Sequence, residues 1–452
     1  MKRLFGTDGV RGIANEFLTC ELASNIGKAL GKTLIGSGTN QKAKIIIGAD
    51  TRLSSDMLVS AICAGLCAVG CDCYTLGVVP TPAVAYLVKE CDAKAGVMIS
   101  ASHNPYNYNG IKIFNKDGFK LSDELEEYIE DLVASDDIKN VRCATSEMGR
   151  VYDAKDLVKK YVEYLKSSID FDLSGLKIAI DCSNGSAAMT AKDVFSGCGA
   201  ECHFIACEPN GTNINDSCGS THIDSIAEYV RNNSMDVGIA YDGDADRCLA
   251  TDELGNEIDG DFIMAILSLA LKAEGKLNKN TVVGTIMTNY GFTKFCEDND
   301  ISFTATKVGD RYVLESMELS GFSFGGEQSG HIILREFATT GDGQMTSLHL
   351  LSHIKKSGKK LSELASVMKK YPQHMVNLTA NSAQKNIFFT NEEIQSIIAS
   401  ATEELSGNGR IVARPSGTEP VIRIMVEGID KDKTVSICES VAAKIQAILN
   451  QY

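Results

Sequence analysis

The sequence lacks the features that mark a membrane-spanning or a nucleic-acid-binding chain. It contains no apolar run of roughly 18 residues, the length that a transmembrane helix needs. It also contains no Lys/Arg-rich run, and its formal net charge of -15 opposes contact with a phosphate backbone. We therefore expect no membrane partner and no nucleic-acid partner, and the charge balance favours a small-molecule ligand instead.

Cysteine usage and the N-terminal residues both favour a reducing, cytoplasmic location. The 15 cysteines are odd in number and scattered along the chain, which favours reduced packing residues over a disulfide framework. Cys63, Cys67, Cys71 and Cys73 lie close together in sequence, but no CxxC pair accompanies them, so buried apolar side chains are favoured over a zinc site. The first residues turn polar too early for a secretory signal peptide.

Three aspartates at alternate positions carry the strongest chemical signal. Asp242, Asp244 and Asp246 lie between two apolar runs, and carboxylates this close repel one another unless a hard cation such as Mg²⁺, Mn²⁺ or Ca²⁺ neutralises them. The spacing also matches a calcium loop that ends at Glu253, but Arg247 stands where that loop needs glycine. A solvated acidic turn is the plainer alternative, and the flanking apolar runs disfavour it.

A unit of strand, short turn, helix and second strand recurs along the first three quarters of the chain. Its copies begin at residues 44–50, 176–181 and 281–286. Strands that alternate with helices predict mixed or largely parallel sheets covered on both faces. A charged amphipathic pattern also predicts a helix from Tyr152 to Leu165, leading into the second unit.

The pattern changes after Pro372 to strand, helix, hairpin and helix, which predicts a smaller α+β domain with an antiparallel sheet. The expected elements are Met375–Leu378, Asn391–Leu405, Arg410–Ala413 with Val421–Glu427, and Lys433–Leu449. At 452 residues the chain exceeds one hydrophobic core. We predict an α/β protein of four domains, with boundaries at 1–150, 151–251, 252–370 and 371–452.

Four further segments carry candidate chemistry. Ser102 follows an apolar strand at a Pro-stopped turn, so its hydroxyl is either a nucleophile or, as is usual for serines in turns, a hydrogen-bonding cap. Residues 324–331 combine a carboxylate, an amide, a hydroxyl and an imidazole with three glycines, and this loop could contact sugar hydroxyls or simply face water. Residues 414–420 with Arg423 predict either a phosphate-binding loop or a rigid hairpin loop. The glycine-rich residues 5–12 add a further arginine.

Taken together and in this order, the motifs FGTDGVRG, SASHNP with NGIK, DGDADR, GGEQSGH and RPSGTEP resemble the α-D-phosphohexomutase superfamily, over nearly the whole chain. The resemblance implies three related α/β mixed-sheet domains plus a smaller C-terminal α+β domain around a central cleft. It also implies an isomerase that works through a phosphoserine and a sugar 1,6-bisphosphate, which serves as intermediate and activator.

The resemblance carries specific roles onto this sequence. Ser102 matches the serine that holds the phosphoryl group, and its phosphate joins the three aspartates as ligands of one Mg²⁺: Asp242, Asp244 and Asp246. Glu327 and Ser329 match sugar contacts, and the substrate's phosphate is expected at Arg414, Ser416, Gly417, Thr418 and Arg423. The remaining catalytic candidates are Arg11, Lys112, His331, His103 and Arg247. The proton-transfer group is one of Arg11, Lys112 and His331, and the sequence does not decide among them. His103 is expected to orient the serine.

Within the superfamily, the sequence favours the amino-sugar branch. The opening FGTDGVRG, the segment 307–311 and Gln328, where glucose and mannose relatives typically carry methionine, all match that branch. The expected reaction interconverts glucosamine 6-phosphate and glucosamine 1-phosphate and feeds UDP-N-acetylglucosamine and cell-wall precursor synthesis. The alternatives are a glucose or mannose phosphate mutase, a phosphatase, and a non-catalytic sugar-phosphate-binding protein. We expect a hexosamine phosphate as partner, and a monomer or homodimer.

Overall fold

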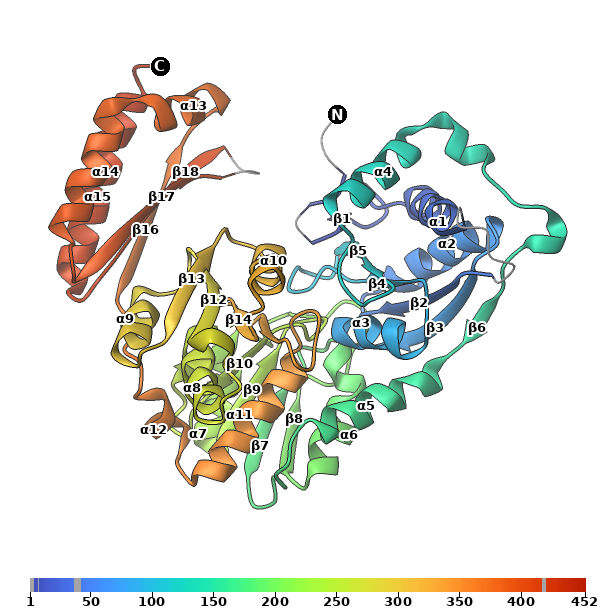
Figure 1. Ribbon diagram of the computed structural model, residues 1–452, viewed down its shortest axis with the longest axis horizontal. Helices are drawn as coiled ribbons and strands as arrows, with labels where there is room; N and C mark the ends of the chain where they lie inside the picture. Colours follow the sequence, from blue (N-terminus) through green and yellow to red (C-terminus); the bar gives the residue numbers. More distant parts are fainter. Residues whose placement is uncertain (1–3, 7, 36–41, 417–419) are drawn as a thin grey trace. The chain divides into compact units, whose positions relative to one another are not determined.

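The computed structural model describes residues 4–6, 8–35, 42–416 and 420–452. The chain forms two compact units (Figure 1). The larger unit comprises Met1–Thr285 and Thr304–Ser366, and the smaller unit comprises Ile286–Phe303 and Val367–Tyr452. Among the helices of the described residues, none has both the length and the hydropathy that crossing a bilayer requires.

The first sheet begins the larger unit. Its strands in the described residues are, in spatial order, β1 (Val10–Ile13), β5 (Tyr108–Asn115), β4 (Ala95–Ile99), β2 (Lys44–Ala49), β3 (Asp72–Val78) and β6 (Val151–Asp153). The run Ile45–Ala49 is buried throughout, as a central parallel strand covered on both faces requires. The helices of this segment are α1 (Cys20–Ile35), α2 (Ser55–Ala68), α3 (Thr81–Glu90) and α4 (Asp123–Ala134).

The second and third sheets follow in the chain. The second sheet has the order β11 (Glu257–Ile258), β10 (Cys248–Thr251), β9 (Val237–Tyr241), β7 (Lys177–Asp181) and β8 (Glu201–Ile205). The third has the order β13 (Ser302–Thr306), β12 (Thr281–Thr285), β14 (Phe324–Gly326) and β15 (Ile332–Leu334). The α-helices from 158 to 365 are α5 (Val158–Ser167), α6 (Ala191–Phe195), α7 (Ile223–Asn233), α8 (Gly260–Ala273), α9 (Tyr290–Asp298), α10 (Asp310–Ser320), α11 (Gly343–Ser357) and α12 (Leu361–Ala365).

One strand order repeats in all three sheets, which confirms the recurring α/β unit. In each repeat the first strand lies between the second and the third, and the fourth pairs antiparallel with the third: β3-β2-β4-β5, β8-β7-β9-β10 and β13-β12-β14-β15. The loop between the third and fourth strands carries Ser102 in the first repeat, the three aspartates in the second and Glu327 in the third. The three strongest site motifs therefore occupy equivalent positions.

The C-terminal segment forms the predicted antiparallel sheet, in the order β16 (Gln373–Thr379), β18 (Val421–Gly428) and β17 (Gly409–Pro415). The helices α14 (Glu392–Glu404) and α15 (Lys431–Leu449) were predicted, whereas α13 (Ser382–Thr390) was not. Its signal was present, because Asn381 and Gln384 form a capping box at its start. Buried apolar residues of the helices and strands form a separate core here.

The predicted helix from Tyr152 to Leu165 is wrong from Tyr152 to Leu157. Val151–Asp153 forms β6, which pairs in parallel with β3, and α5 begins only at Val158. A β-branched and an aromatic residue favour a strand here, and the Tyr152 ring stacks on Tyr74 with centroids 4.9 Å apart. The short 3-10 segments of the chain are Asp136–Asn140, Thr145–Glu147, Lys155–Leu157, Ser186–Met189, Ser196–Cys198 and Asn278–Asn280.

Candidate active site

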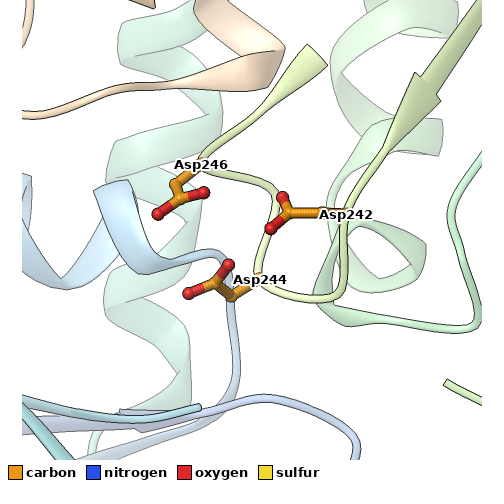
Figure 2. Close-up of side chains that lie close together, drawn as sticks. All are labelled: Asp242, Asp244 and Asp246. Atoms are coloured by element: carbon orange, nitrogen blue, oxygen red, sulfur yellow. The ribbon is translucent and has the colours of Figure 1, made fainter. Parts of the chain in front are cut away.

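The three aspartates of the β9–β10 loop converge on one space (Figure 2). Asp242, Asp244 and Asp246 are buried, and one carboxylate oxygen from each lies within 4.8 Å of the others. Arg247 directly follows them, and its backbone N–H donates to Asp242 Oδ1 at 3.2 Å. Burial raises the pKa of Asp242 well above its ordinary value, and the neighbouring carboxylates add to the effect. The ionised form of Asp242 is therefore disfavoured unless further positive charge joins the cluster.

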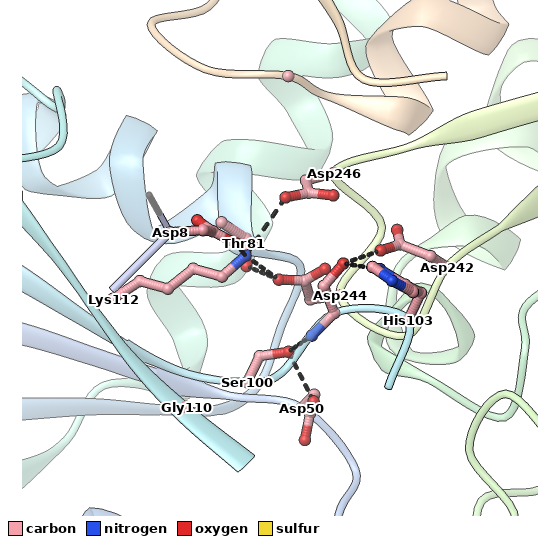
Figure 3. A network of polar contacts seen from close by, with 12 residues as sticks. Asp8, Asp50, Thr81, Ser100, His103, Gly110, Lys112, Asp242, Asp244 and Asp246 are labelled. Carbon is pink, nitrogen blue, oxygen red and sulfur yellow. Dashed lines mark hydrogen bonds and ion pairs between the residues drawn. The ribbon is translucent and has the colours of Figure 1, made fainter. Parts of the chain in front are cut away.

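The hydrogen bonds of these aspartates leave room for a metal ion. Asp244 Oδ2 accepts from Thr81 Oγ1 at 2.6 Å and from Lys112 Nζ at 2.7 Å (Figure 3). Asp244 Oδ1 and Asp246 Oδ1, in contrast, are buried and accept no hydrogen bond within the described residues. Buried carboxylate oxygens without a donor are costly, and an all-oxygen set of this kind fits a hard divalent cation.

Ser102 lies on the β4–β5 loop and faces this cluster. Its Oγ donates to Asp242 Oδ2 at 2.5 Å and lies 3.4 Å from His103 Nδ1. The serine is buried and has a φ of 53°, in the left-handed region that non-glycine residues rarely adopt. Burial lowers the pKa of His103 to about 4, and the charges of Arg247 and Arg11 act in the same direction. His103 is therefore a neutral imidazole beside the serine near pH 7.

Two buried charged residues that the sequence patterns did not reveal hold the serine loop. Arg52 Nε pairs with Asp50 Oδ2 at 2.8 Å, and both side chains are fully buried. Arg52 also donates to the carbonyls of Ser102 and Asn104, each at 2.8 Å. Ser100 Oγ donates to Asp50 and accepts from the Ser102 N–H. The position of Asp50, directly after the apolar strand β2, was the signal that could have identified this support.

Lys112 is the cation at the centre of the carboxylates (Figure 3). Its ammonium lies 2.7 Å from Asp244, 3.1 Å from Asp8 and 3.3 Å from Asp246, and its side chain is 1% exposed. Burial lowers the pKa of Lys112, but the three carboxylates outweigh that effect and the net shift is upward. Burial raises the pKa of Asp246, but Lys112 and His331 outweigh that effect, and the net shift places its pKa well below the ordinary value.

A second group of charges connects the first and third repeats. Lys120 donates to Asp8 at 2.5 Å and also bonds Asp310 at the start of α10. His331 lies between carboxylates, with Nδ1 3.6 Å from Asp246 and Nε2 3.5 Å from Asp310. Burial lowers the pKa of His331, but these two carboxylates outweigh it and raise the pKa overall. Arg11 pairs with Asp8. The sequence patterns predicted neither Lys120 nor the two carboxylates at 8 and 310.

The β14–β15 loop packs directly against the aspartate loop. The N–H of Cys248 donates to the carbonyl of Gly330 at 3.1 Å. Gly330 has a φ of +88°, and a Cβ there would lie 2.3 Å from the Cys248 carbonyl oxygen, so this contact requires glycine. Glu327 and Ser329 are half-buried in this loop, and Glu327 Oε1 accepts from the Gly309 N–H at 3.1 Å.

Gln328 of the same loop bonds to the start of α8. Its Nε2 donates to Asp259 Oδ2 at 3.2 Å, and the Gln328 carbonyl accepts from the Gly260 N–H at 2.9 Å. Asp259 is the N-cap of α8. The Gln328 side chain and carbonyl therefore tie the loop to the start of α8.

The arginine loop belongs to the smaller unit. Arg414 on β17 stands directly opposite Arg423 on β18, and like charges in this position repel each other. Burial lowers the pKa of Arg414, and the charge of Arg423 lowers it further. An anion would relieve this repulsion. Ser416 closes the end of the hairpin, with its N–H bonded to the Val421 carbonyl at 2.8 Å. Gly417 and Thr418 lie outside the described residues.

The cysteines of the described residues are all free thiols. Cys63 and Cys73 are buried, Cys67 is half-buried, and the sulfurs of Cys67 and Cys73 are 3.9 Å apart. Within the described ranges, the aspartate triad is the only group of three ligand atoms close enough to hold a metal ion. Cys63, Cys71 and Cys73 belong to the hydrophobic core around the first sheet, and Cys67 packs against it.

Four family models match the chain in sequence order. They describe the phosphoglucomutase/phosphomannomutase α/β/α domains I, II and III and the C-terminal domain, over residues 2–139, 159–255, 259–371 and 357–444. A phosphoglucosamine mutase of Caldicellulosiruptor bescii is 52% identical over 452 residues, which is 100% of both chains. A phosphoglucosamine mutase of Clostridium botulinum is 50% identical over 448 residues, or 99% of each chain.

Solved structures share the fold. A phosphoglucomutase/phosphomannomutase family protein from Burkholderia thailandensis aligns with a TM-score of 0.83 at 21% identity, over 100% of this chain and 98% of that one. An N-acetylphosphoglucosamine mutase from Aspergillus fumigatus, in complex with GlcNAc-6P and magnesium, aligns with a TM-score of 0.65 at 17% identity, over 98% of this chain and 95% of that one.

Proposed function

Because the chain belongs to the phosphoglucomutase/phosphomannomutase family, we propose that its site interconverts glucosamine 6-phosphate and glucosamine 1-phosphate, the phosphoglucosamine mutase reaction. The chain is an isomerase of the phosphohexomutase type, and full-length identity of 50% and above to curated phosphoglucosamine mutases supports the amino-sugar substrate. The observation that carries the chemistry is the 2.5 Å contact between Ser102 Oγ and Asp242.

The metal ion fits the residues that would hold it. Asp242, Asp244 and Asp246 are the proposed protein ligands of one Mg²⁺, and an oxygen of phosphorylated Ser102 is the further ligand. The magnesium in the Aspergillus fumigatus complex supports the choice of Mg²⁺. When bound, Mg²⁺ neutralises charge on the phosphoryl oxygens and the carboxylates.

The proposed reaction is two phosphoryl transfers at one serine. In the first, the bond between Ser102 Oγ and phosphorus breaks and the hydroxyl oxygen on C1 of the 6-phosphate takes the phosphoryl group. The hydroxyl loses its proton to the site, and Ser102 regains one. The resulting 1,6-bisphosphate turns around, and the bond between its O6 and phosphorus breaks as the phosphoryl group returns to Ser102 Oγ. The serine hydroxyl loses its proton to the site and O6 gains one, which leaves glucosamine 1-phosphate. The left-handed backbone at Ser102 and its contact with Asp242 support this carrier role.

The basic side chains around the serine have separate proposed roles. Lys112 faces three carboxylates, so we assign it to organising the charge of the site. Arg11 and His331 are the candidates for proton transfer at the sugar hydroxyl, because Arg11 donates to Asn104 of the serine loop at 3.3 Å and His331 lies 3.6 Å from Asp246 of the aspartate loop. His103 orients Ser102 Oγ, and Arg247 fixes Asp242 through its backbone N–H.

Substrate recognition is assigned to two loops. Glu327 and Ser329 are the proposed contacts to sugar hydroxyls. Because either end of the bisphosphate must be accepted, a generic anion grip is needed for the second phosphate. Arg414, Ser416 and Arg423 supply charge and hydrogen-bond donors of that kind, together with Gly417 and Thr418. The small-molecule partner is thus a hexosamine phosphate, whereas the cytoplasmic location and the monomer or homodimer stay predictions.

A side-by-side substrate comparison tests this proposal. The purified chain would be supplied with Mg²⁺, a catalytic amount of sugar 1,6-bisphosphate, and glucosamine 6-phosphate, glucose 6-phosphate or mannose 6-phosphate in turn. The proposal expects the highest kcat/KM with glucosamine 6-phosphate. A higher value with glucose or mannose 6-phosphate would assign the chain to another branch, and binding of all three without turnover would leave a sugar-phosphate-binding protein.

A further inference from the structure

The two carbonyls that flank His103 are each held by two side chains. Arg52 Nη2 donates to the carbonyls of Ser102 and Asn104 from the end of β2. Asn215 Nδ2 donates to the same two carbonyls, at 2.9 Å and 3.1 Å. Asn215 lies between β8 and α7, in the second repeat. A guanidinium and an amide from separate repeats therefore bind the same short stretch of backbone.

The geometry of Asn215 is set by these carbonyls. The residue is buried, and its Oδ1 has no hydrogen-bond partner within the described residues, so the donor side of the amide determines its orientation. With the amide turned over, Oδ1 would face two carbonyl oxygens. The backbone is fixed as well, because the Asn215 N–H donates to the Ser183 carbonyl at 2.9 Å.

The aspartate loop packs against this arrangement. A Cβ on Gly243 would lie 2.7 Å from the Ser102 carbonyl oxygen and 2.9 Å from Asn215 Nδ2. The carbonyl of Ser102, the amide of Asn215 and the backbone between Asp242 and Asp244 are thus in mutual contact. A shift of the serine backbone would change its distance to the aspartates directly.

We propose that Asn215 is a positioning residue for phosphoryl transfer, which clamps the carbonyls of Ser102 and Asn104 and so aims Ser102 Oγ at the aspartate triad. The inference rests on the proposed role of Ser102 as the phosphoryl carrier. The left-handed backbone at Ser102 is intrinsically disfavoured for a residue with a Cβ, so it needs external support. Asn215 acts through that backbone, and its loss should affect the chemical step more than sugar binding.

Asn215→Ala removes the clamp, and Asn213→Ala is the matched control. Asn213 is two positions away, and its side chain bonds only within its own loop, to the Glu208 carbonyl and the Asn210 N–H, among the described contacts. Asn215→Leu keeps most of the volume and guards against a cavity effect. Each protein would be assayed for kcat and KM with glucosamine 6-phosphate, for the rate at which sugar bisphosphate phosphorylates Ser102, and for thermal midpoint.

The rate of amide hydrogen exchange over residues 99–108 measures how firmly the backbone of the serine loop is held, without any substrate. We expect both Asn215 variants to exchange faster there, with kcat and serine phosphorylation reduced about 100-fold and KM nearly unchanged, while Asn213→Ala behaves as wild type. Wild-type kcat in the Asn215 variants, a change in KM alone, or unaltered exchange would each overturn the inference. A wild type that turns over no hexose phosphate would instead refute the proposed function, and the exchange comparison would still decide whether the clamp exists.

Discussion

Lys112 supplies the buried positive charge among the site carboxylates, so Lys112→Met should strongly destabilise the metal-free chain. The ammonium is within 3.3 Å of Asp244, Asp8 and Asp246, and the side chain is 1% exposed. Removing one partner of a buried ion pair costs about 3–5 kcal/mol, because the other charge stays buried and unpaired. For a folding unit of this size, that loss lowers the thermal midpoint by on the order of 10 °C.

The assay is thermal unfolding of wild type, Lys112→Met and Lys116→Met, with and without Mg²⁺. Lys116 is the control, because its ion pair with Asp117 is on the surface and its side chain is 68% exposed. Exposed pairs contribute only about 0–1 kcal/mol. Mg²⁺ should restore part of the midpoint of Lys112→Met and have a smaller effect on the other two proteins. Equal midpoints for the two variants, or equal gains with Mg²⁺, would refute the reasoning.

Two further changes test separate parts of the chain. Burial raises the pKa of Asp342 from 3.8 to about 6, so the ionised carboxylate costs folding energy that is absent below about pH 4 and complete above about pH 6. Asp342→Asn should therefore raise the free energy of unfolding by up to about 3 kcal/mol, and with it the thermal midpoint, at pH 8 but not at pH 4; a difference independent of pH would contradict this. Arg414→Met removes charge-assisted phosphate contacts and should raise KM for glucosamine 6-phosphate by about 10- to 100-fold. Steady-state kinetics measure this, and an unchanged KM would exclude Arg414 from the phosphate grip.

Local patterns were sufficient for much of the fold. A buried strand has a run of apolar residues, as at β2, and a helix start has a capping residue, as Asn391 at α14, so both can be predicted from neighbouring positions. The aspartates at 242, 244 and 246 could be read in the same way, because all three occupy one loop. Tyr152 was misplaced because pairing with β3, rather than its own helical pattern, decides its structure.

The supports of the site could not be read from neighbouring positions. Asn215 bonds a carbonyl 113 positions earlier in the chain, and Lys120 reaches Asp310 over 190 positions. Sequence patterns do not reveal which loops meet, since that depends on how the repeats pack. The same limit applies to Gln328, whose amide bonds Asp259. The four domain boundaries and the central cleft stay predictions from the sequence and the resemblance.

The most direct test of the account is a phosphoryl chase followed by intact-protein mass. Wild type and Ser102→Ala would be incubated with sugar 1,6-bisphosphate and Mg²⁺, freed of small molecules, and then given glucosamine 6-phosphate. The account predicts a phosphoryl-sized mass increment on wild type only. If the phosphoryl group loaded from the bisphosphate is isotope-labelled, the chase replaces it on Ser102 with the unlabelled group of the 6-phosphate, and the label appears in glucosamine 1-phosphate. An increment of equal size on Ser102→Ala, or a labelled phosphoryl group that glucosamine 6-phosphate leaves in place on wild type, would contradict phosphoryl transfer through Ser102.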